Sequence, residues 1–297
     1  MPPMLKSTLK WALLLGSLLA VGPLVATLMM RVNDVDGGRA VTFLVNGDLT
    51  AALMTLAVLV GCVLTVGVVA ARLFGLSTAM ACAGFIVAWT ASAQGNLESI
   101  VRRAVGGEDL PKLAVEGLLV TLAAGVAAAL FGRISAAAHA SAVKPSSDRS
   151  RGPLSLLVTG DTARENPVPI LLASLAAGVI VSAIGVWLIA LSGARNQTLA
   201  AAILGGIAAG AVNQVLSANR SFTLTPLVPI LSIALLGLLA PLVVLGVEGQ
   251  GANLVARIYD GTVLNLARPV SLDWAAGALI GVPLGMSWAG SAAKPTN

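Results

Sequence analysis

Charged side chains are scarce in this sequence. They make up 10% of its 297 residues, whereas a soluble globular domain has about 25%. Hydrophobic residues make up 57%, and the charges gather in short segments between long apolar runs. This composition excludes an ordinary soluble domain. It predicts an all-α, polytopic membrane protein in which the apolar runs cross the bilayer as helices.

Histidine and cysteine are almost absent, and this removes several kinds of site. His139 is the only histidine, so neither a His-Glu-x-x-His motif nor a multi-histidine zinc site can form. Cys62 and Cys82 lie within apolar runs and make no Cys-x-x-Cys pair. We interpret both as small buried hydrophobic residues. The sequence therefore predicts no metal site and no cofactor.

Catalytic motifs are missing as well. The sequence contains no Gly-x-Ser-x-Gly motif, no P-loop, and no pair of carboxylates at helical spacing inside an apolar run. Glu116, near the start of an apolar run, is the acidic or basic residue closest to the interior of a span. A charge inside a membrane costs about 2.5–3.5 kcal/mol and usually serves a function such as ion coupling. We therefore expect that the chain is not an enzyme.

Eight apolar runs are candidate membrane spans, because about 20 apolar residues in a helix cross the hydrocarbon core. They lie at residues 11–30, 51–71, 76–93, 113–131, 168–191, 198–216, 226–247 and 274–289, and the last is short. The longest polar segment, residues 135–167, is rich in Ser, Pro and charge and is typical of a flexible linker. The sequence thus predicts two four-span halves, residues 1–134 and 168–297, joined by this linker.

Two polar connections have amphipathic patterns and a faint mutual similarity. Residues 96–112 are predicted to form a short helix on the membrane surface, and residues 248–273 are a second amphipathic connection. Residues 94–116 and 250–273 each contain Gln-Gly, Asn-Leu and a Pro, and end in an acid, Glu116 or Asp273. Parallel repeats are one way to build a substrate site between two halves. Chance similarity of two amphipathic loops is the alternative.

Small residues recur at every fourth position in two of the spans, and each series leads to an amide. On a helix such residues form a ridge that lets a neighbouring helix approach closely, and an amide can then bond across the contact. We predicted that the span at 198–216 lies at the centre of the bundle. The candidates for helix packing or pore lining are Gly84, Ser92, Gln94, Asn96, Gly206, Gly210, Asn213 and Gln214.

Two classes of function remain open from the sequence. The first is a non-catalytic scaffold or a subunit of a membrane complex. The second is a facilitated pathway or transporter for a small neutral solute, with its site between the halves. The expected partners are the lipid bilayer and, in a complex, other membrane proteins or a second copy of the chain.

The distribution of charge bears on partners and orientation. The net charge of +5 comes without a basic stripe or aromatic platform, so we expect an interaction with lipid surfaces and none with nucleic acid. A small excess of Lys and Arg falls on one side of the predicted spans. By the positive-inside rule, this excess puts both termini in the cytoplasm of a cell-membrane protein.

Overall fold

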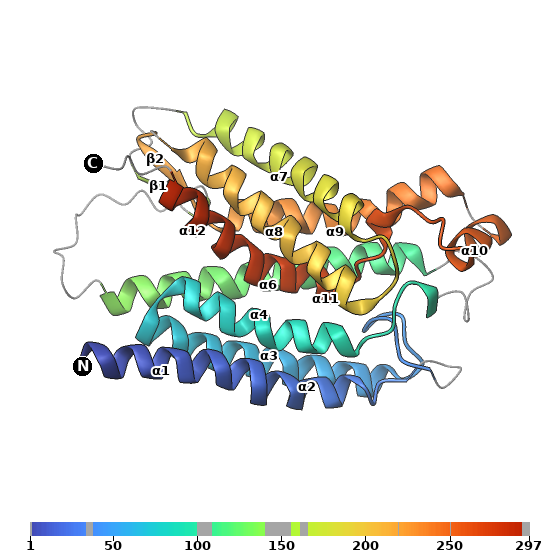
Figure 1. Cartoon of the computed structure of the whole chain (residues 1–297), viewed down its shortest axis with the longest axis horizontal. Helices are drawn as coiled ribbons and strands as arrows, with labels where there is room; N and C mark the ends of the chain where they lie inside the picture. The colour runs from blue at the N-terminus through green and yellow to red at the C-terminus, as the bar shows by residue number, and fades with distance from the viewer. Residues whose placement is uncertain are drawn as a thin grey trace.

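The computed structural model describes residues 2–33, 38–99, 109–139, 156–160, 166–218, 220–249 and 251–292. The described chain is a helix bundle with one two-stranded sheet, in which β1 (Val158–Gly160) pairs antiparallel with β2 (Phe222–Leu224). Figure 1 shows the long helices side by side along the long axis of the molecule. The helices are α1 (Pro3–Gly16), η1 (Ser17–Val21), α2 (Gly22–Met29), α3 (Leu49–Phe74), α4 (Leu76–Ala93), α6 (Leu110–His139), α7 (Val168–Ile189), α8 (Arg195–Ser217), α9 (Leu227–Glu248), α10 (Ala252–Tyr259), η4 (Asn265–Ala267), α11 (Ser271–Ala276), η5 (Gly277–Gly281) and α12 (Val282–Ala292).

Seven helical segments of the described chain are long and apolar enough to cross a membrane. They correspond to the first seven predicted spans, and they confirm an all-α, multi-pass membrane protein. The eighth predicted span lies in the continuous run from α11 through η5 to α12, which is not one of the seven. This run is rich in glycine, and its first part, through Val282, is buried among other helices, so that part does not need an apolar surface toward lipid. It still runs along the bundle, and α12 ends at the end of the bundle where α1 begins (Figure 1).

Local sequence signals account for several helix boundaries. The carboxylate of Asp48 caps α3 by accepting the backbone N–H of Ala51 at 3.0 Å. Gly75 ends α3 with a φ of 94°, a conformation that glycine adopts without strain, and α4 begins at the next residue. Gly75 thus forms the tight turn of a helical hairpin, and its two helices, α3 and α4, pack against each other.

Two helical runs contain a wide π turn directly before an X-Pro pair. The first, η1, precedes Gly22-Pro23, where the sequence predicts a kink; the second, η5, precedes Val282-Pro283. A proline lacks the N–H needed for the helical ladder, and its ring clashes with a preceding carbonyl. A π turn accommodates both effects without ending the helix. Pro241, by contrast, lies inside α9, which continues on both sides of it.

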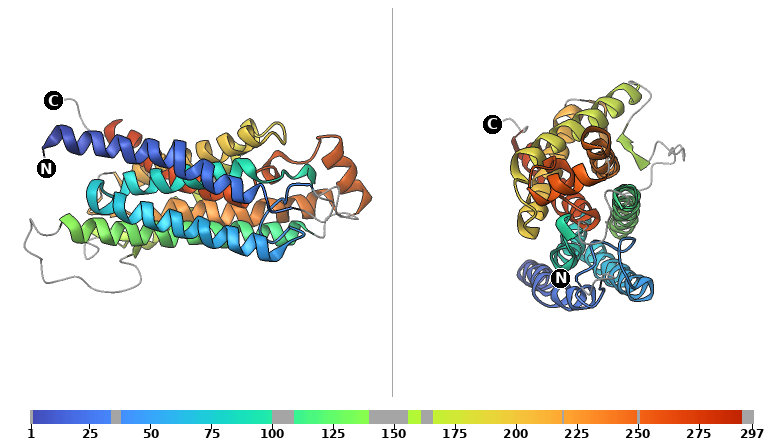
Figure 2. Two further views of the ribbon diagram at one scale, coloured as in Figure 1. Left: turned by 90° about the horizontal axis from the view of Figure 1, so that it is seen from below. Right: turned by 90° about the vertical axis from the view of Figure 1, so that its right-hand side faces the viewer.

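The most enclosed part of the molecule is the stretch that leads into and through α11 and η5, rather than the span at 198–216. Every residue from Ala267 to Val282 is buried, and α11 packs against α4, α6, α8 and α9. The end-on view in Figure 2 shows the red C-terminal helices among their neighbours. The α8 helix, in contrast, leaves Leu204 and Val215 exposed. The prediction that residues 198–216 occupy the centre is therefore corrected: α8 is one wall around that centre.

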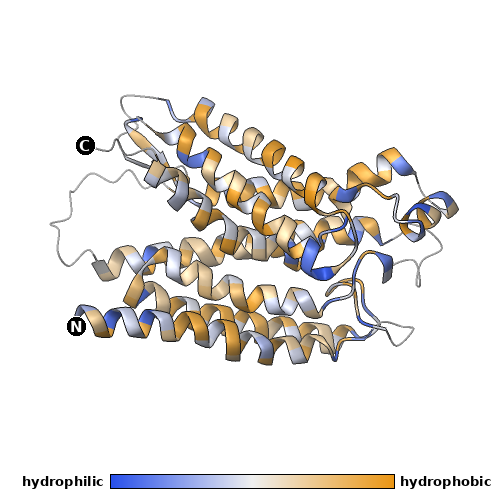
Figure 3. Cartoon of the chain, viewed as in Figure 1, coloured by the Kyte–Doolittle hydropathy of each residue, from blue (hydrophilic) through white to orange (hydrophobic). Residues whose placement is uncertain are grey.

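Loops close one end of the bundle, which we call the capped end. Residues 38–48 and 94–99 meet there, with the backbone N–H of Gly95 donating to the carbonyl of Ala40 at 2.8 Å. A separate apolar cluster holds the cap together and includes Val41, Leu97, Leu254 and Ile258. The amphipathic helix α10 belongs to this cap. Figure 3 shows apolar residues along the bundle and hydrophilic residues gathered near its ends.

The predicted linker and the predicted halves are only partly visible. The helix α6 continues to His139, so residues 135–139 are helical, and residues 158–160 form β1; residues 140–155 and 161–165 lie outside the described residues. The expected surface helix at 96–112 also lies largely outside them, at residues 100–108. Helix α6 packs against α9, and α11 packs against α4. Helices near the end of each predicted half thus pack against the other half, while the division itself stays a prediction.

Candidate functional site

Three ionisable side chains at the capped end lie around the start of α11, apart from other buried ionisable residues at this end such as Arg268. Glu116 belongs to the second turn of α6, Arg195 is the first residue of α8, and Asp273 lies in the first turn of α11. Glu116 is 3% exposed and Asp273 is fully buried. Buried ionisable groups are rare in membrane proteins and mark candidate functional sites, so this polar cluster is the candidate site.

Arg195 and Asp273 form a bidentate ion pair. Nη1 of Arg195 donates to Oδ2 of Asp273 at 3.0 Å, and Nη2 donates to Oδ1 at 2.9 Å. The same guanidinium donates from Nε and Nη2 to the carbonyl of Ala91, at 3.1 and 2.6 Å. That carbonyl lies in the last turn of α4, where helical carbonyls lack intrahelical partners. One side chain therefore joins the ends of α4, α8 and α11.

Asp273 also organises the start of its own helix. Its Oδ2 accepts the backbone N–H of Val270 at 2.9 Å, the contact that an acid at the third helical position makes in a capping box. The carboxylate thus has donors on both oxygens, including a guanidinium. This satisfies the condition under which a charge pair can be buried, namely good geometry with its remaining hydrogen-bonding capacity filled.

Glu116 joins α6 to a loop and to α11. Its Oε1 accepts the backbone N–H of Phe43 at 3.2 Å and the hydroxyl of Ser271 at 2.6 Å. Its Oε2 accepts the backbone N–H of Leu44 at 2.7 Å. Within the described residues, these partners are all neutral. Because Ser271 and Asp273 share the first turn of α11, the two buried carboxylates fix the same helix start from two sides.

Gln94 is the one predicted candidate at this end whose polar atoms are buried without a partner. It follows α4 directly, is 1% exposed, and neither Oε1 nor Nε2 has a hydrogen-bond partner in the described part of the chain. It lies between Ala91, which receives Arg195, and Gly95, which donates to the loop at Ala40. A buried amide usually needs a partner or an ordered water.

The other predicted candidates lie in two separate places along the bundle. Asn96 also lies at the capped end, where Nδ2 donates to the carbonyl of Gly193 at 3.3 Å. The hydroxyl of Ser92 donates to the carbonyl of Trp89 within the same helix at 2.7 Å. At the opposite end, the buried Asn213 accepts the hydroxyl of Ser174 at 2.9 Å. Gln214 lies beside Gly290 of α12. The amides of the two ridges therefore do not meet.

The glycines of the two ridges face the same partner. A Cβ added to Gly206 would lie 2.1 Å from the carbonyl oxygen of Gly277, and one added to Gly210 would lie 2.4 Å from that of Val282. From the other side, a Cβ at Gly84 would lie 2.4 Å from Cγ1 of Ile280. Because these glycines have no side chains, α4 and α8 pack closely against the run from η5 to α12.

Sequence reasoning missed Arg195 and Asp273. Both were assigned to polar connections outside the spans, since each is next to a polar segment and nothing in a single sequence pairs them. One signal did point to this place: the faint repeat ends at Glu116 in its first copy and at Asp273 in its second. Ser271, which donates to Glu116 and is two residues before Asp273, links the two acids where the predicted halves meet.

The chemistry of this cluster is that of a structural tie. The described residues contain no group of three or more His, Cys, Asp or Glu side chains placed to hold a metal. The groups that surround the two carboxylates are backbone N–H donors, a serine hydroxyl already bonded to Glu116, and the guanidinium of Arg195. No family model, no curated protein and no solved structure matches this chain.

Proposed function

We propose that this multi-pass membrane protein is a non-catalytic scaffold or a subunit of a membrane complex. The observation that carries the proposal is how the buried polar cluster is used. Arg195, Asp273, Glu116 and Ser271 hydrogen-bond to one another, to the end of α4, to the loop at Phe43 and to the backbone just before α11. Such a cluster stabilises one arrangement of the helices, and both of its carboxylates already accept hydrogen bonds from the protein.

Close packing around the last helical run supports the same proposal. The glycines of α4 and α8 bring neighbouring backbones together, and a methyl group would already collide at these contacts. Transport by alternating access requires one part of the bundle to rock against another. A run held by backbone contact on one side and by buried charges at its start resists such movement. The expected partners are lipid together with other membrane proteins or a second copy.

A transporter for a small neutral solute is the second candidate, and one observation favours it. The last helical run contains the π turn η5, and α11 packs against helices of both predicted halves. Substrate sites lie at the interface of two repeats in several transporter folds, and π turns occur frequently at functional sites. The unpartnered amide of Gln94, close to the start of this run, would then face a solute or water.

Flux measurements separate the two candidates. Proteoliposomes that contain the purified chain are tested for swelling in a panel of neutral solutes such as glycerol, urea and small sugars. The scaffold proposal predicts the rates of empty liposomes, together with a stoichiometric complex when the chain is purified under mild conditions from its native membrane. Saturable swelling that is lost in a Gln94→Leu variant would overturn the scaffold and support the transporter.

A further inference from the structure

The two ends of the bundle differ in charge. In the described part of the chain, every acidic residue lies at the capped end, from Asp48 before α3 to Asp273 in α11. The opposite end, which we call the basic end, carries four exposed cations on α1, α3 and α6: Lys6, Lys10, Arg72 and Arg133. Residues 140–155 and 161–165, which are not described, hold four basic and three acidic side chains, so they do not change the sign of this balance.

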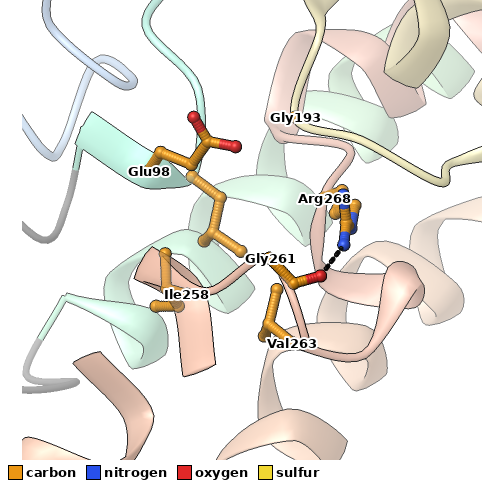
Figure 4. A pocket seen from close by; sticks show the side chains of 7 residues that line it. Glu98, Gly193, Ile258, Gly261, Val263 and Arg268 are labelled. Atoms are coloured by element: carbon orange, nitrogen blue, oxygen red, sulfur yellow. Dashed lines mark hydrogen bonds between the residues drawn. The ribbon is translucent and has the colours of Figure 1, made fainter. Parts of the chain in front are cut away.

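Charges of the cap have partners or little space around them, whereas those of the basic end are open. Arg195 pairs with Asp273. The pocket between Glu98 and Arg268, drawn in Figure 4, has an interior of about 10 Å³, room for about one water molecule. Within the described residues, the four cations of the basic end form no ion pair. An anionic partner is therefore attracted to the basic end more strongly than to the cap.

The start of α1 projects from the basic end with its side chains exposed. Residues 2–12 are all exposed, and α1 extends past the α3–α4 turn in both Figure 1 and Figure 2. Helical spacing puts Lys6 and Lys10 on the same face as Ser17, which is buried where the helix reaches the bundle. The two lysines therefore lie on the bundle side of α1, beyond the turn that follows Arg72.

The other face of α1 is apolar and suits lipid acyl chains. Met4, Trp11 and Leu15 share this face by helical spacing and are 84%, 60% and 48% exposed. Trp288, near the end of α12, is also 60% exposed. Tryptophan is enriched at the level of the lipid headgroups. The basic end therefore lies at the headgroup layer, where its cations are within reach of phosphate groups.

We propose that the basic end is a docking surface for anionic phospholipid. Lys6, Lys10 and Arg72 donate charge-assisted hydrogen bonds to headgroup phosphates, and the apolar face of α1 contacts the acyl chains. Complementary charge and the two exposed tryptophans are the reasons for choosing lipid as the partner. The surface serves a scaffold and a transporter alike, so it goes beyond the proposed function and does not depend on it.

The test uses the purified full chain in nanodiscs of either phosphatidylcholine or phosphatidylglycerol. A partner that binds only the folded state raises Tm, so we expect a higher Tm in phosphatidylglycerol. The difference should shrink in about 1 M NaCl, where the Debye length falls to about 3 Å. Equal Tm in the two lipids, or a difference that salt leaves unchanged, would overturn the proposal.

Variants decide whether the basic end is responsible for the difference. Lys6→Gln combined with Lys10→Gln removes two of the four cations and should abolish about half of the Tm difference, because each basic residue near an anionic surface contributes a similar amount. Adding Arg72→Gln and Arg133→Gln should remove most of the remainder. All four side chains are exposed, so the fold should stay intact in phosphatidylcholine. A full difference in the fourfold variant would contradict the proposal.

The matched control removes two exposed arginines of the capped end, by Arg31→Gln combined with Arg257→Gln. It changes the net charge as much as the lysine pair does and should keep the full Tm difference. Loss of the difference in this control would show an effect of total charge and would overturn the assignment to the basic end. In phosphatidylcholine discs, polyglutamate and an RNA oligonucleotide should leave Tm unchanged. Stabilisation by either, without an effect of phosphatidylglycerol, would identify an acidic macromolecule in place of lipid.

Discussion

At the residue scale, the Arg195–Asp273 pair joins α4, α8 and α11 at the capped end. The guanidinium reaches three helix ends, and the carboxylate is fully buried while the arginine side chain is 14% exposed. Desolvation opposes the Coulomb attraction of such a pair, so the intact pair can be no more stabilising than apolar residues of similar size. Removing one partner alone is different, since a buried charge then stays behind without its counter-ion.

Asp273→Asn should therefore lower the stability of the detergent-solubilised protein by about 3–5 kcal/mol, measured as a clear drop in Tm. Arg195→Met combined with Asp273→Leu removes both charges and should recover part of that loss. The matched control is Asp260→Asn, which changes an exposed acid of the same cap and should melt like the parent chain. A normal Tm for Asp273→Asn would show that the pair is not a stabilising tie.

At the element scale, the contact between the last helical run and α8 depends on glycines, which have no side chains. Gly206 and Gly210 on α8, and Gly277, Gly281 and Gly285 on the run itself, lie so close to carbonyl groups that no Cβ fits. Close backbone contact of this kind is a main source of helix association in membranes, where lipid provides no hydrophobic driving force between helices. The polar cluster then fixes the start of the same run.

Single methyl groups test this contact. Gly206→Ala places a Cβ 2.1 Å from the carbonyl oxygen of Gly277, and Gly285→Ala places one 2.0 Å from that of Ile207. Overpacking typically costs about 1–3 kcal/mol, so both variants should melt at lower temperature. Gly61→Ala in α3 has nothing within 4 Å of its new Cβ and should keep or raise Tm, because alanine favours helix more than glycine does. Equal Tm for all three variants would exclude a tight α8–α12 interface.

At the scale of the whole molecule, the two predicted halves share their interfaces. The helix α6 of the first half packs against α9 of the second, and α11 of the second packs against α4 of the first. A covalent connection between the halves is therefore not needed to hold them together once the chain has folded.

Limited trypsin digestion should cut first within residues 140–155, where the sequence predicts a flexible linker with Lys144, Arg149 and Arg151. The two fragments should remain associated in detergent, so that an affinity tag at the C-terminus also recovers the N-terminal fragment. Fragments that separate without denaturant, or first cuts elsewhere in the chain, would contradict the two-half organisation.

Orientation is a second prediction for the whole molecule. The helix α10 and the start of α1 lie at opposite ends of the bundle (Figure 1), and the charge distribution puts the start of α1 in the cytoplasm. In a chain with Cys62 and Cys82 replaced by alanine, Tyr259→Cys should react with an impermeant thiol reagent on intact cells, and Lys6→Cys should not. Both parent side chains are exposed, so burial does not limit either reaction, and the reverse labelling pattern would reverse the topology.

The sequence by itself determined the class of this protein. Long apolar runs separated by short charged segments predicted the helices, because backbone groups in a bilayer must be bonded within the segment and apolar length must match the membrane. The Gly22-Pro23 pair also predicted a kink in the first span, and in the structure the π turn η1 directly precedes this pair. These properties depend on neighbours along the chain, which a single sequence displays.

Only the tertiary structure decided which helix is central and where the buried charges lie. Arg195 and Asp273 are separated by a long stretch of sequence and are each next to a polar connection, so local pattern assigns them to loops. Their pairing depends on α4, α8 and α11 ending at one place. The last predicted span is short, and the sequence does not show which helix its glycines contact. In the structure these glycines bring η5 and α12 against α8, because neither surface carries side chains at the contact.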